Sequence, residues 1–192
     1  MNQKTGLQER LTSMREFVDE FLVPSNSRVV TTLDFALAQS STKSIAYLAQ
    51  HHLFEQIPQM KGDIEAFPSL CGDNNPIHVN AWIGTGGTRT PCHFDSYDNL
   101  FVQIVGAKYV RLYNSNETDR LYVMNQSDSN YGKQGNMSAI DCEAEDYTKH
   151  PLLEHVKYVE AILYPGDCLY IPARVWHYVR SLSTSASVNY WF

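Results

Sequence analysis

The chain has 192 residues, 43% of them hydrophobic, which is enough for one globular domain with a sizeable core. Its formal net charge of -6 gives no basic surface for direct nucleic-acid binding, but an acidic domain can recognise a basic protein or peptide. No apolar run approaches the ~18–20 residues of a membrane span, and the polar first residues contain no signal-peptide core, so no membrane partner is expected.

The four cysteines, Cys71, Cys92, Cys142 and Cys168, form no Cys-x-x-Cys pair. Their spacing therefore favours neither a zinc site nor a redox motif. Reduced thiols are the simplest interpretation, and they suit a nuclear and/or cytoplasmic protein.

The first part of the chain, residues 1–46, is predicted to be a helical segment. Residues 7–22 place apolar side chains at helical spacings and are followed by Pro24, which indicates an amphipathic helix. A second helix is predicted around residues 29–39. The apolar positions of the first helix are Leu7, Leu11, Met14, Phe17, Val18, Phe21 and Leu22.

From Tyr47 onward the sequence changes to short runs rich in Val, Ile, Tyr and Trp, separated by turn residues such as Gly106 and Gly166. Many short strands of this kind indicate a mainly β fold, which could be a sandwich, a jelly roll or a barrel. Residues 114–151 are polar, and we expect them to form a long, partly mobile insertion between strands. The predicted strands cover residues 77–83, 99–105, 107–113, 158–164, 167–171, 176–182 and 186–191.

A metal-binding pattern occurs at His93-Phe94-Asp95. Its two metal-ligating side chains are two residues apart, so on a strand both would point to the same face. This arrangement suits two of the three ligands of a two-histidine, one-carboxylate metal site. With seven histidines and 21 acidic residues in the chain, however, the pair alone can arise by chance.

His177 is the candidate for the third ligand. It follows a turn, a short predicted strand and a second turn, which would return the chain to the same end of the fold. The alternative is an ordinary core or rim histidine beside Trp176. The remaining histidines have no matching partner and are expected to be structural or exposed, namely His51, His52, His78, His150 and His155.

Lys108 lies within a predicted strand otherwise made of Tyr, Val, Arg and Leu. Alternation places Lys108 on the same face as Val110 and Leu112, which favours an inward side chain. A buried lysine is costly unless it meets an anion. The alternative is a side chain that points to solvent.

Several stretches together resemble the jumonji-C (JmjC) family of Fe(II)- and 2-oxoglutarate-dependent oxygenases. They cover most of residues 47–113 and 157–192 in the family's order and spacing. The resemblance implies a double-stranded β-helix, a jelly roll of the cupin type, over residues 47–192, preceded by N-terminal helices. The matching stretches include Tyr47-Leu-Ala-Gln-His51, Asn80-Ala-Trp-Ile-Gly84, Pro91-Cys-His-Phe-Asp95, Asn99 to Tyr113, Pro165-Gly-Asp167 and Trp176 to Trp191.

The resemblance also implies the site residues. His93, Asp95 and His177 match the iron ligands of the family, which leave positions for 2-oxoglutarate and O₂. Lys108 matches the lysine that binds the distal carboxylate of 2-oxoglutarate, and Tyr47 matches a tyrosine whose hydroxyl assists it. A charge-assisted hydrogen bond from lysine to carboxylate in a partly dry pocket is strong.

Four further residues match the family's pocket. Thr90 and Asn99 match polar contacts to the co-substrate, whereas Trp82 and Trp191 match aromatic residues that line the pocket. For the two tryptophans, ordinary core packing is the alternative role.

The most similar branch of the family resembles protein hydroxylases that act on arginine side chains, and histone lysine demethylation has also been proposed for its members. Either substrate would be basic, and demethylation would follow hydroxylation of an N-methyl group. The first alternative is a non-catalytic JmjC or cupin-like binding protein that retains the metal site. The second is a cupin enzyme that uses the metal without 2-oxoglutarate, but Lys108, Tyr47 and Asn99 argue against it.

One stretch departs from the family pattern. Family members usually carry additional sequence before the helix predicted at residues 7–22, including an acidic residue and a tryptophan that shape the arginine pocket. The first residues of this chain contain no tryptophan and no clear counterpart of that acid. We therefore expect complete iron and 2-oxoglutarate sites beside an incomplete substrate pocket, with slow uncoupled turnover and poor arginine hydroxylation.

Overall fold

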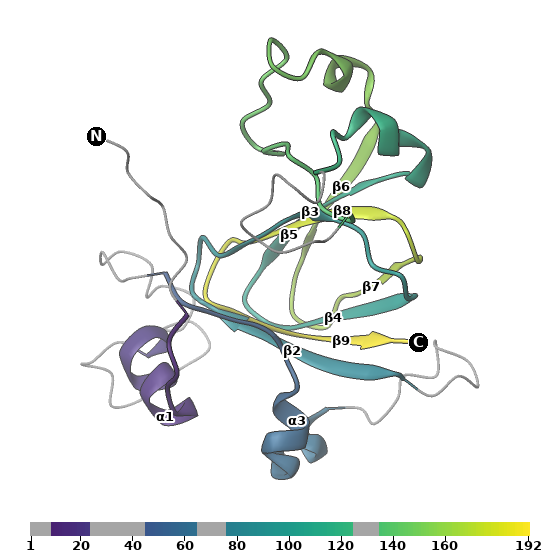
Figure 1. The fold of residues 1–192 in the computed structure, drawn as a ribbon. Coiled ribbons are helices and arrows are strands. Elements are labelled where there is room, and N and C mark those ends of the chain that lie inside the picture. Colours follow the sequence, from purple (N-terminus) through teal and green to yellow (C-terminus); the bar gives the residue numbers. More distant parts are fainter. Residues whose placement is uncertain (1–8, 24–44, 65–75, 125–134) are drawn as a thin grey trace.

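The computed structural model describes residues 9–23, 45–64, 76–124 and 135–192 (Figure 1). The helix predicted at residues 29–39 lies outside these ranges. Among the described residues, no helix is long and apolar enough to cross a membrane. Among the described cysteines, Cys92 and Cys142 are buried and Cys168 is exposed, and these three form no disulfide with one another.

The first helix begins later than predicted. Helix α1 (Met14–Phe17) continues into the π-helical turn η1 (Val18–Leu22). Ser13 accepts a hydrogen bond from the Glu16 amide while the Glu16 carboxylate accepts one from Ser13, and this capping box defines the helix start. Leu11 is consequently fully exposed, so its assignment to the apolar helix face was wrong, whereas Phe17 is buried.

In the described part of the chain, nine strands form two antiparallel sheets that face each other, which confirms the predicted jelly roll (Figure 1). The five-stranded sheet contains, in spatial order, β1 (Tyr47–His51), β2 (His78–Gly84), β9 (Ser185–Trp191), β4 (Asn99–Val105) and β7 (Cys168–Ile171). The four-stranded sheet contains β3 (Arg89–His93), β8 (Trp176–Ser181), β5 (Lys108–Tyr113) and β6 (Tyr158–Leu163).

The inner faces of the two sheets enclose an apolar core. Its buried members alternate along their strands with outward-facing residues, as the period-2 pattern requires. They come from both sheets, and they are Phe101, Val110, Leu163, Ile171 and Val179. Short helices α3 (Leu53–Gln56) and η3 (Pro58–Asp63) follow β1, and α3 contributes Leu53 and Phe54 to a second core cluster outside the five-stranded sheet.

The seven predicted strands are present with ends shifted by at most one residue, but strands β1 and β3 were missed. Both lie at sheet edges, where each pairs with one neighbour within its sheet. Edge strands tolerate polar residues and proline. Strand β3 contains Pro91, and β1 exposes Ala49 and Gln50, so neither sequence has the apolar character of a central strand.

The insertion predicted at residues 114–151 contains more structure than its polar composition indicated. Its described part includes the 3-10 helix η5 (Ser115–Arg120) and precedes another, η6 (Pro151–His155). Figure 1 shows it at one end of the two-sheet body. Leu121, Ile140 and Cys142 from the insertion pack with Trp176 and Tyr178 of β8 in a buried cluster, so this segment shares a core with the four-stranded sheet.

Candidate functional site

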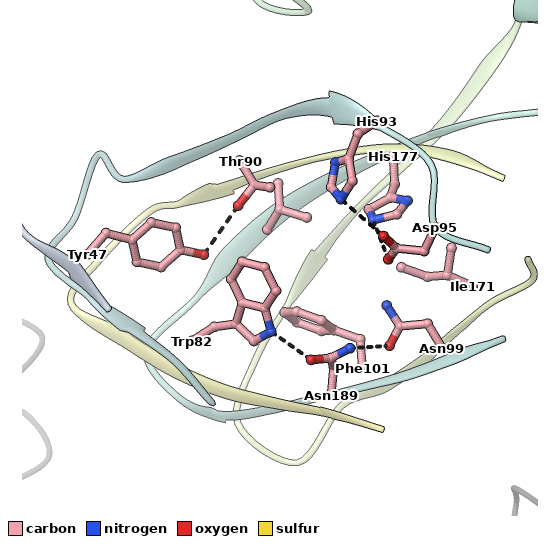
Figure 2. A pocket seen from close by; sticks show the side chains of 11 residues that line it. Tyr47, Trp82, Thr90, His93, Asp95, Asn99, Phe101, Ile171, His177 and Asn189 are labelled. Carbon is pink, nitrogen blue, oxygen red and sulfur yellow. Dashed lines mark hydrogen bonds and ion pairs between the residues drawn. The ribbon is translucent and has the colours of Figure 1, made fainter. Parts of the chain in front are cut away.

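Three potential metal ligands meet between the sheets. His93 is the last residue of β3, and the pairing of β3 with β8 places it opposite His177. His93 Nε2 lies 3.7 Å from Asp95 Oδ1, and His177 Nε2 lies 3.6 Å from Asp95 Oδ2. One ligand atom from each residue lies within 4.8 Å of the others, and Figure 2 shows the three groups facing one another. A single metal ion can contact all three.

Both imidazoles are oriented through their Nδ1 atoms. His93 Nδ1 lies 2.8 Å from the carbonyl oxygen of Pro91, and His177 Nδ1 lies 3.0 Å from that of Val175. Because a carbonyl oxygen can only accept, each Nδ1 carries the hydrogen and donates it. The Nε2 lone pairs are therefore left for a metal, which is the usual tautomer of a histidine ligand.

Burial sets the protonation of the cluster. Burial and, to a smaller degree, the neighbouring His93 lower the pKa of His177 to about 3, so the imidazole is neutral. Burial raises the pKa of Asp95, against the opposing effects of His93 and Trp191. Two imidazoles and one carboxylate form a donor set typical of divalent iron or manganese, so the residues fit such an ion.

The expectation that one strand carries both His93 and Asp95 was wrong, because β3 ends at His93. Asp95 lies in the following segment, where its carbonyl accepts a hydrogen bond from the Arg174 amide at 2.8 Å. Its carboxylate still meets the two histidines. The backbone at Arg174, just before β8, therefore helps to position Asp95, which lies beyond the hydrogen-bonded part of β3.

A pocket of about 350 Å³, including its open mouth, extends from the triad between the sheets (Figure 2). Four of the residues that match the family's co-substrate site line it, namely Tyr47, Trp82, Thr90 and Asn99. Sequence reasoning missed four further lining residues, namely Phe101, Ile171, Val179 and Asn189. All four lie on predicted strands, but which of them face the pocket depends on how those strands are paired.

Asn189 joins two of the predicted residues. Its Oδ1 accepts a hydrogen bond from Trp82 Nε1 at 2.7 Å, and its Nδ2 donates to Asn99 Oδ1 at 3.1 Å. This chain crosses strands β2, β9 and β4 and fixes the orientation of all three side chains. The alternation of β9, in which Asn189 shares a face with Trp191, is the sequence signal that could have found it.

Tyr47 and Thr90 lie at the end of the pocket opposite the triad (Figure 2). Their hydroxyl oxygens are 3.3 Å apart. Burial raises the pKa of Tyr47 to about 12, so its phenol stays protonated and can donate a hydrogen bond.

Lys108 is fully buried, as the alternation of β5 predicted. Its Nζ has no hydrogen-bond partner among the described residues, and it lies 5.7 Å from the ring centre of Tyr47 and 5.4 Å from that of Phe101. Both rings line the pocket, although Lys108 itself lies behind them. Burial lowers the lysine pKa to about 7. The position suits an ammonium group that pairs with an incoming anion.

Trp191 does not line the described pocket. Its indole is stacked on Tyr97, with ring centres 5.6 Å apart, and meets His78 edge-on at 6.1 Å. This aromatic group lies beside the triad, since Tyr97 is two residues beyond Asp95.

The jelly roll and its two-histidine, one-carboxylate cluster define a cupin-like protein with a candidate metal centre. A family model described as a cupin-like domain matches residues 2–192. Together with its relatives, this match shows that the chain belongs to the JmjC family of cupin-like proteins.

The chain is 42% identical to JmjC domain-containing protein F of Dictyostelium discoideum, a match covering 96% of this chain and 42% of that protein. It is 37% identical to lysine-specific demethylase 8 of Xenopus tropicalis, covering 96% and 38%. For lysine-specific demethylase JMJ30 of Arabidopsis thaliana the identity is 40%, covering 80% and 35%. The chain thus matches about two fifths of the length of these relatives.

Lys108 provides a test of the site's electrostatics in the metal-free protein. A fall of its pKa from 10.5 to about 7 corresponds to roughly 4–5 kcal/mol of destabilisation below pH 7. The unfolded chain binds more protons than the folded one between these values, so the lysine's penalty shrinks as the pH rises towards 10. We expect Lys108→Met to raise the melting temperature at pH 7, by less at pH 9.

The matched control is Lys157→Met, at an exposed lysine, which should change the melting temperature little at either pH. Thermal unfolding in metal-free buffer measures both variants. A Lys108→Met protein that is less stable than the parent at pH 7 would contradict the interpretation of Lys108 as an unpaired buried cation.

Proposed function

We propose that the chain is an Fe(II)- and 2-oxoglutarate-dependent oxygenase that hydroxylates a protein side chain. The observation that carries this proposal is a buried Lys108 whose Nζ has no hydrogen-bond partner among the described residues and lies behind Tyr47 and Phe101, two residues that line the same pocket as the triad. A dicarboxylate co-substrate would supply the anion that this cation lacks. Membership of the JmjC family supports the same function.

In this proposal His93, Asp95 and His177 hold the iron. Lys108 and the Tyr47 hydroxyl bind the distal carboxylate of 2-oxoglutarate. When bound, iron and 2-oxoglutarate supply the O₂-dependent oxidation of a substrate C–H bond. The protein's own contribution is to position the reactants and to exclude water.

Polar side chains on the five-stranded sheet would orient the co-substrate. Asn99 is held by Asn189, which in turn accepts from Trp82, so the carboxamide reaches the pocket already oriented. Thr90 holds the Tyr47 hydroxyl from the other sheet. Prearranged donors lose little conformational entropy when a ligand binds.

Apolar side chains around the pocket would strengthen the binding of the co-substrate. Phe101, Ile171 and Val179 contribute carbon surface to the pocket and keep its dielectric low. An ion pair between Lys108 and a carboxylate is stronger in such surroundings than in water. The desolvation cost of the lysine is already present in the free protein, because Lys108 is buried there.

We propose a basic protein or peptide as the substrate, modified by arginine hydroxylation or by demethylation of N-methyl-lysine through hydroxylation. The net charge of -6 supports a basic partner. Relatives named lysine-specific demethylases support an N-methyl-lysine substrate. The described cysteines form no disulfide with one another, which supports a nuclear and/or cytoplasmic location.

The first test concerns the metal. We expect Asp95→Ala and His93→Ala to weaken Mn(II) binding by at least about 100-fold, because each removes a direct ligand and even outer-shell changes typically cost 10–100-fold. Titration calorimetry with Mn(II), an inert substitute for Fe(II), measures the affinity. The exposed His155→Ala is the control and should bind as the parent does. Parent-like affinity in both ligand variants would overturn the assignment.

The second test concerns the co-substrate. Lys108→Ala should weaken 2-oxoglutarate binding to the Mn(II)-loaded protein roughly tenfold or more, since a hydrogen bond to a charged group is worth about 1.5–3 kcal/mol. Metal affinity should be unchanged. Because the free amine titrates near pH 7 and must be charged to bind a carboxylate, the parent's affinity should fall as the pH rises from 7 to 9.

The control for the second test is Lys157→Ala, which should bind 2-oxoglutarate like the parent at every pH. An unchanged dissociation constant in Lys108→Ala would place the carboxylate site elsewhere. A pH dependence that persists in Lys108→Ala would assign the titration to another group.

The third test concerns the reaction. The protein is incubated with Fe(II), ascorbate, 2-oxoglutarate and peptides that contain arginine or N-methyl-lysine. We expect succinate to form slowly, with arginine peptides gaining little oxygen, and any modification to appear as one added oxygen atom or as a methyl group lost as formaldehyde; Asp95→Ala is the inactive control. Mass spectrometry identifies the product. Succinate without peptide modification would indicate uncoupled turnover, and metal and 2-oxoglutarate binding without succinate would indicate a non-catalytic binding protein.

A further inference from the structure

Residues 136–139 of the insertion run along the free edge of β3. The Ser138 amide donates to the Cys92 carbonyl at 2.9 Å, and Met137 forms an antiparallel bridge with His93. On its other side the segment pairs with residues 122–124, where Ser138 bridges Val123. Strand β3 has only β8 as a neighbour within its sheet, so the insertion covers the edge of the strand that carries His93.

Asn136 continues this contact beyond the end of β3. The Phe94 amide donates to the Asn136 carbonyl at 3.1 Å, and Asn136 Nδ2 donates to the Phe94 carbonyl at 2.7 Å. One residue therefore holds both backbone polar groups of the residue between His93 and Asp95. These two hydrogen bonds restrict the backbone dihedrals that decide where the Asp95 carboxylate points.

The insertion also contacts the residue before His177. Thr118 Oγ1 accepts a hydrogen bond from Trp176 Nε1 at 2.9 Å. The Trp176 ring meets the Phe94 ring edge-on, with ring centres 4.8 Å apart. The insertion thus contacts Phe94 and Trp176, which are the sequence neighbours of the ligands His93 and His177. The contact between the Phe94 and Trp176 rings joins these two sites of support.

We propose that Asn136 is a positioning residue for the metal centre, which holds the Asp95 carboxylate at the distance from His93 and His177 that a metal needs. This inference rests on the proposed function, because it gives the triad a metal to bind. Asp95 needs this support because it lies outside β3, so the pairing of β3 with β8 does not fix its position. Its own backbone contact is the hydrogen bond that its carbonyl accepts from the Arg174 amide. Without the carboxamide, the Phe94 carbonyl loses its side-chain partner and the carboxylate direction becomes variable.

The test compares Asn136→Ala and Asn136→Asp with Ser138→Ala. Asn136→Asp keeps the shape but places an acceptor against the Phe94 carbonyl, so it cannot donate. Ser138→Ala is the matched control, because the Ser138 hydroxyl donates to the Leu121 carbonyl within the insertion and touches no ligand neighbour. Ser138→Ala should loosen the insertion to a comparable degree, but it keeps the backbone hydrogen bond from residue 138 to the Cys92 carbonyl.

Two measurements are made on each variant. Mn(II) affinity should fall about three- to tenfold in both Asn136 variants, the scale of one lost hydrogen bond, and should stay within about twofold in Ser138→Ala. In metal-free protein, amide hydrogen exchange of the peptide covering residues 92–96 should be faster in the Asn136 variants than in the parent and in Ser138→Ala.

The outcomes separate this inference from the proposed function. If Asn136→Ala binds Mn(II) as tightly as the parent, or if Ser138→Ala loses as much affinity, Asn136 has no positioning role. If the parent binds no metal, the proposed function fails. The exchange measurement on metal-free protein then still decides whether Asn136 orders the segment between His93 and Asp95, because parent-like exchange in Asn136→Ala would overturn that ordering.

Discussion

The antiparallel pairing of β3 with β8 is the constraint on which the site depends. This register sets His93 directly opposite His177, although 84 positions separate them in the sequence. A one-residue slip would send the β3 side chains to the opposite face and separate the imidazoles. The pairing itself is weakly specified, since β3 is a short edge strand that contains Pro91. The insertion that lies along its free edge adds the backbone hydrogen bonds that such a strand lacks.

The pocket combines a stable apolar core with a costly cation. Part of its wall belongs to the core between the sheets, to which Phe101, Ile171 and Val179 contribute. Lys108 occupies the same layer without a hydrogen-bond partner among the described residues. Such a charge lowers the stability of the free protein and is understandable if it serves a ligand. Stability and binding therefore make opposite demands on this one position.

The insertion has two physical roles that its composition conceals. It contributes apolar side chains such as Leu121 and Cys142 to a cluster that covers the outer face of β8. Ion pairs add to this attachment, since Arg180 of β8 contacts Glu143 at 2.6 Å and Arg111 of β5 contacts Glu145 at 2.8 Å. Pairs that are partly buried and share a network hold better than isolated surface pairs. The insertion is thus docked on the sheet that supplies both histidines of the triad.

The sequence by itself determined seven of the described strands and the inward direction of Lys108, because alternation is a local property of the chain, whereas the jelly roll and the full triad followed from the motifs that the chain shares with the JmjC family. Only the tertiary structure decided that β3 ends at His93, that Asn189 joins Trp82 to Asn99, and that Trp191 lies outside the described pocket. It also showed a polar loop holding the backbone between two ligands. These features depend on which strands and loops become neighbours, and that is set by packing between residues far apart in the sequence.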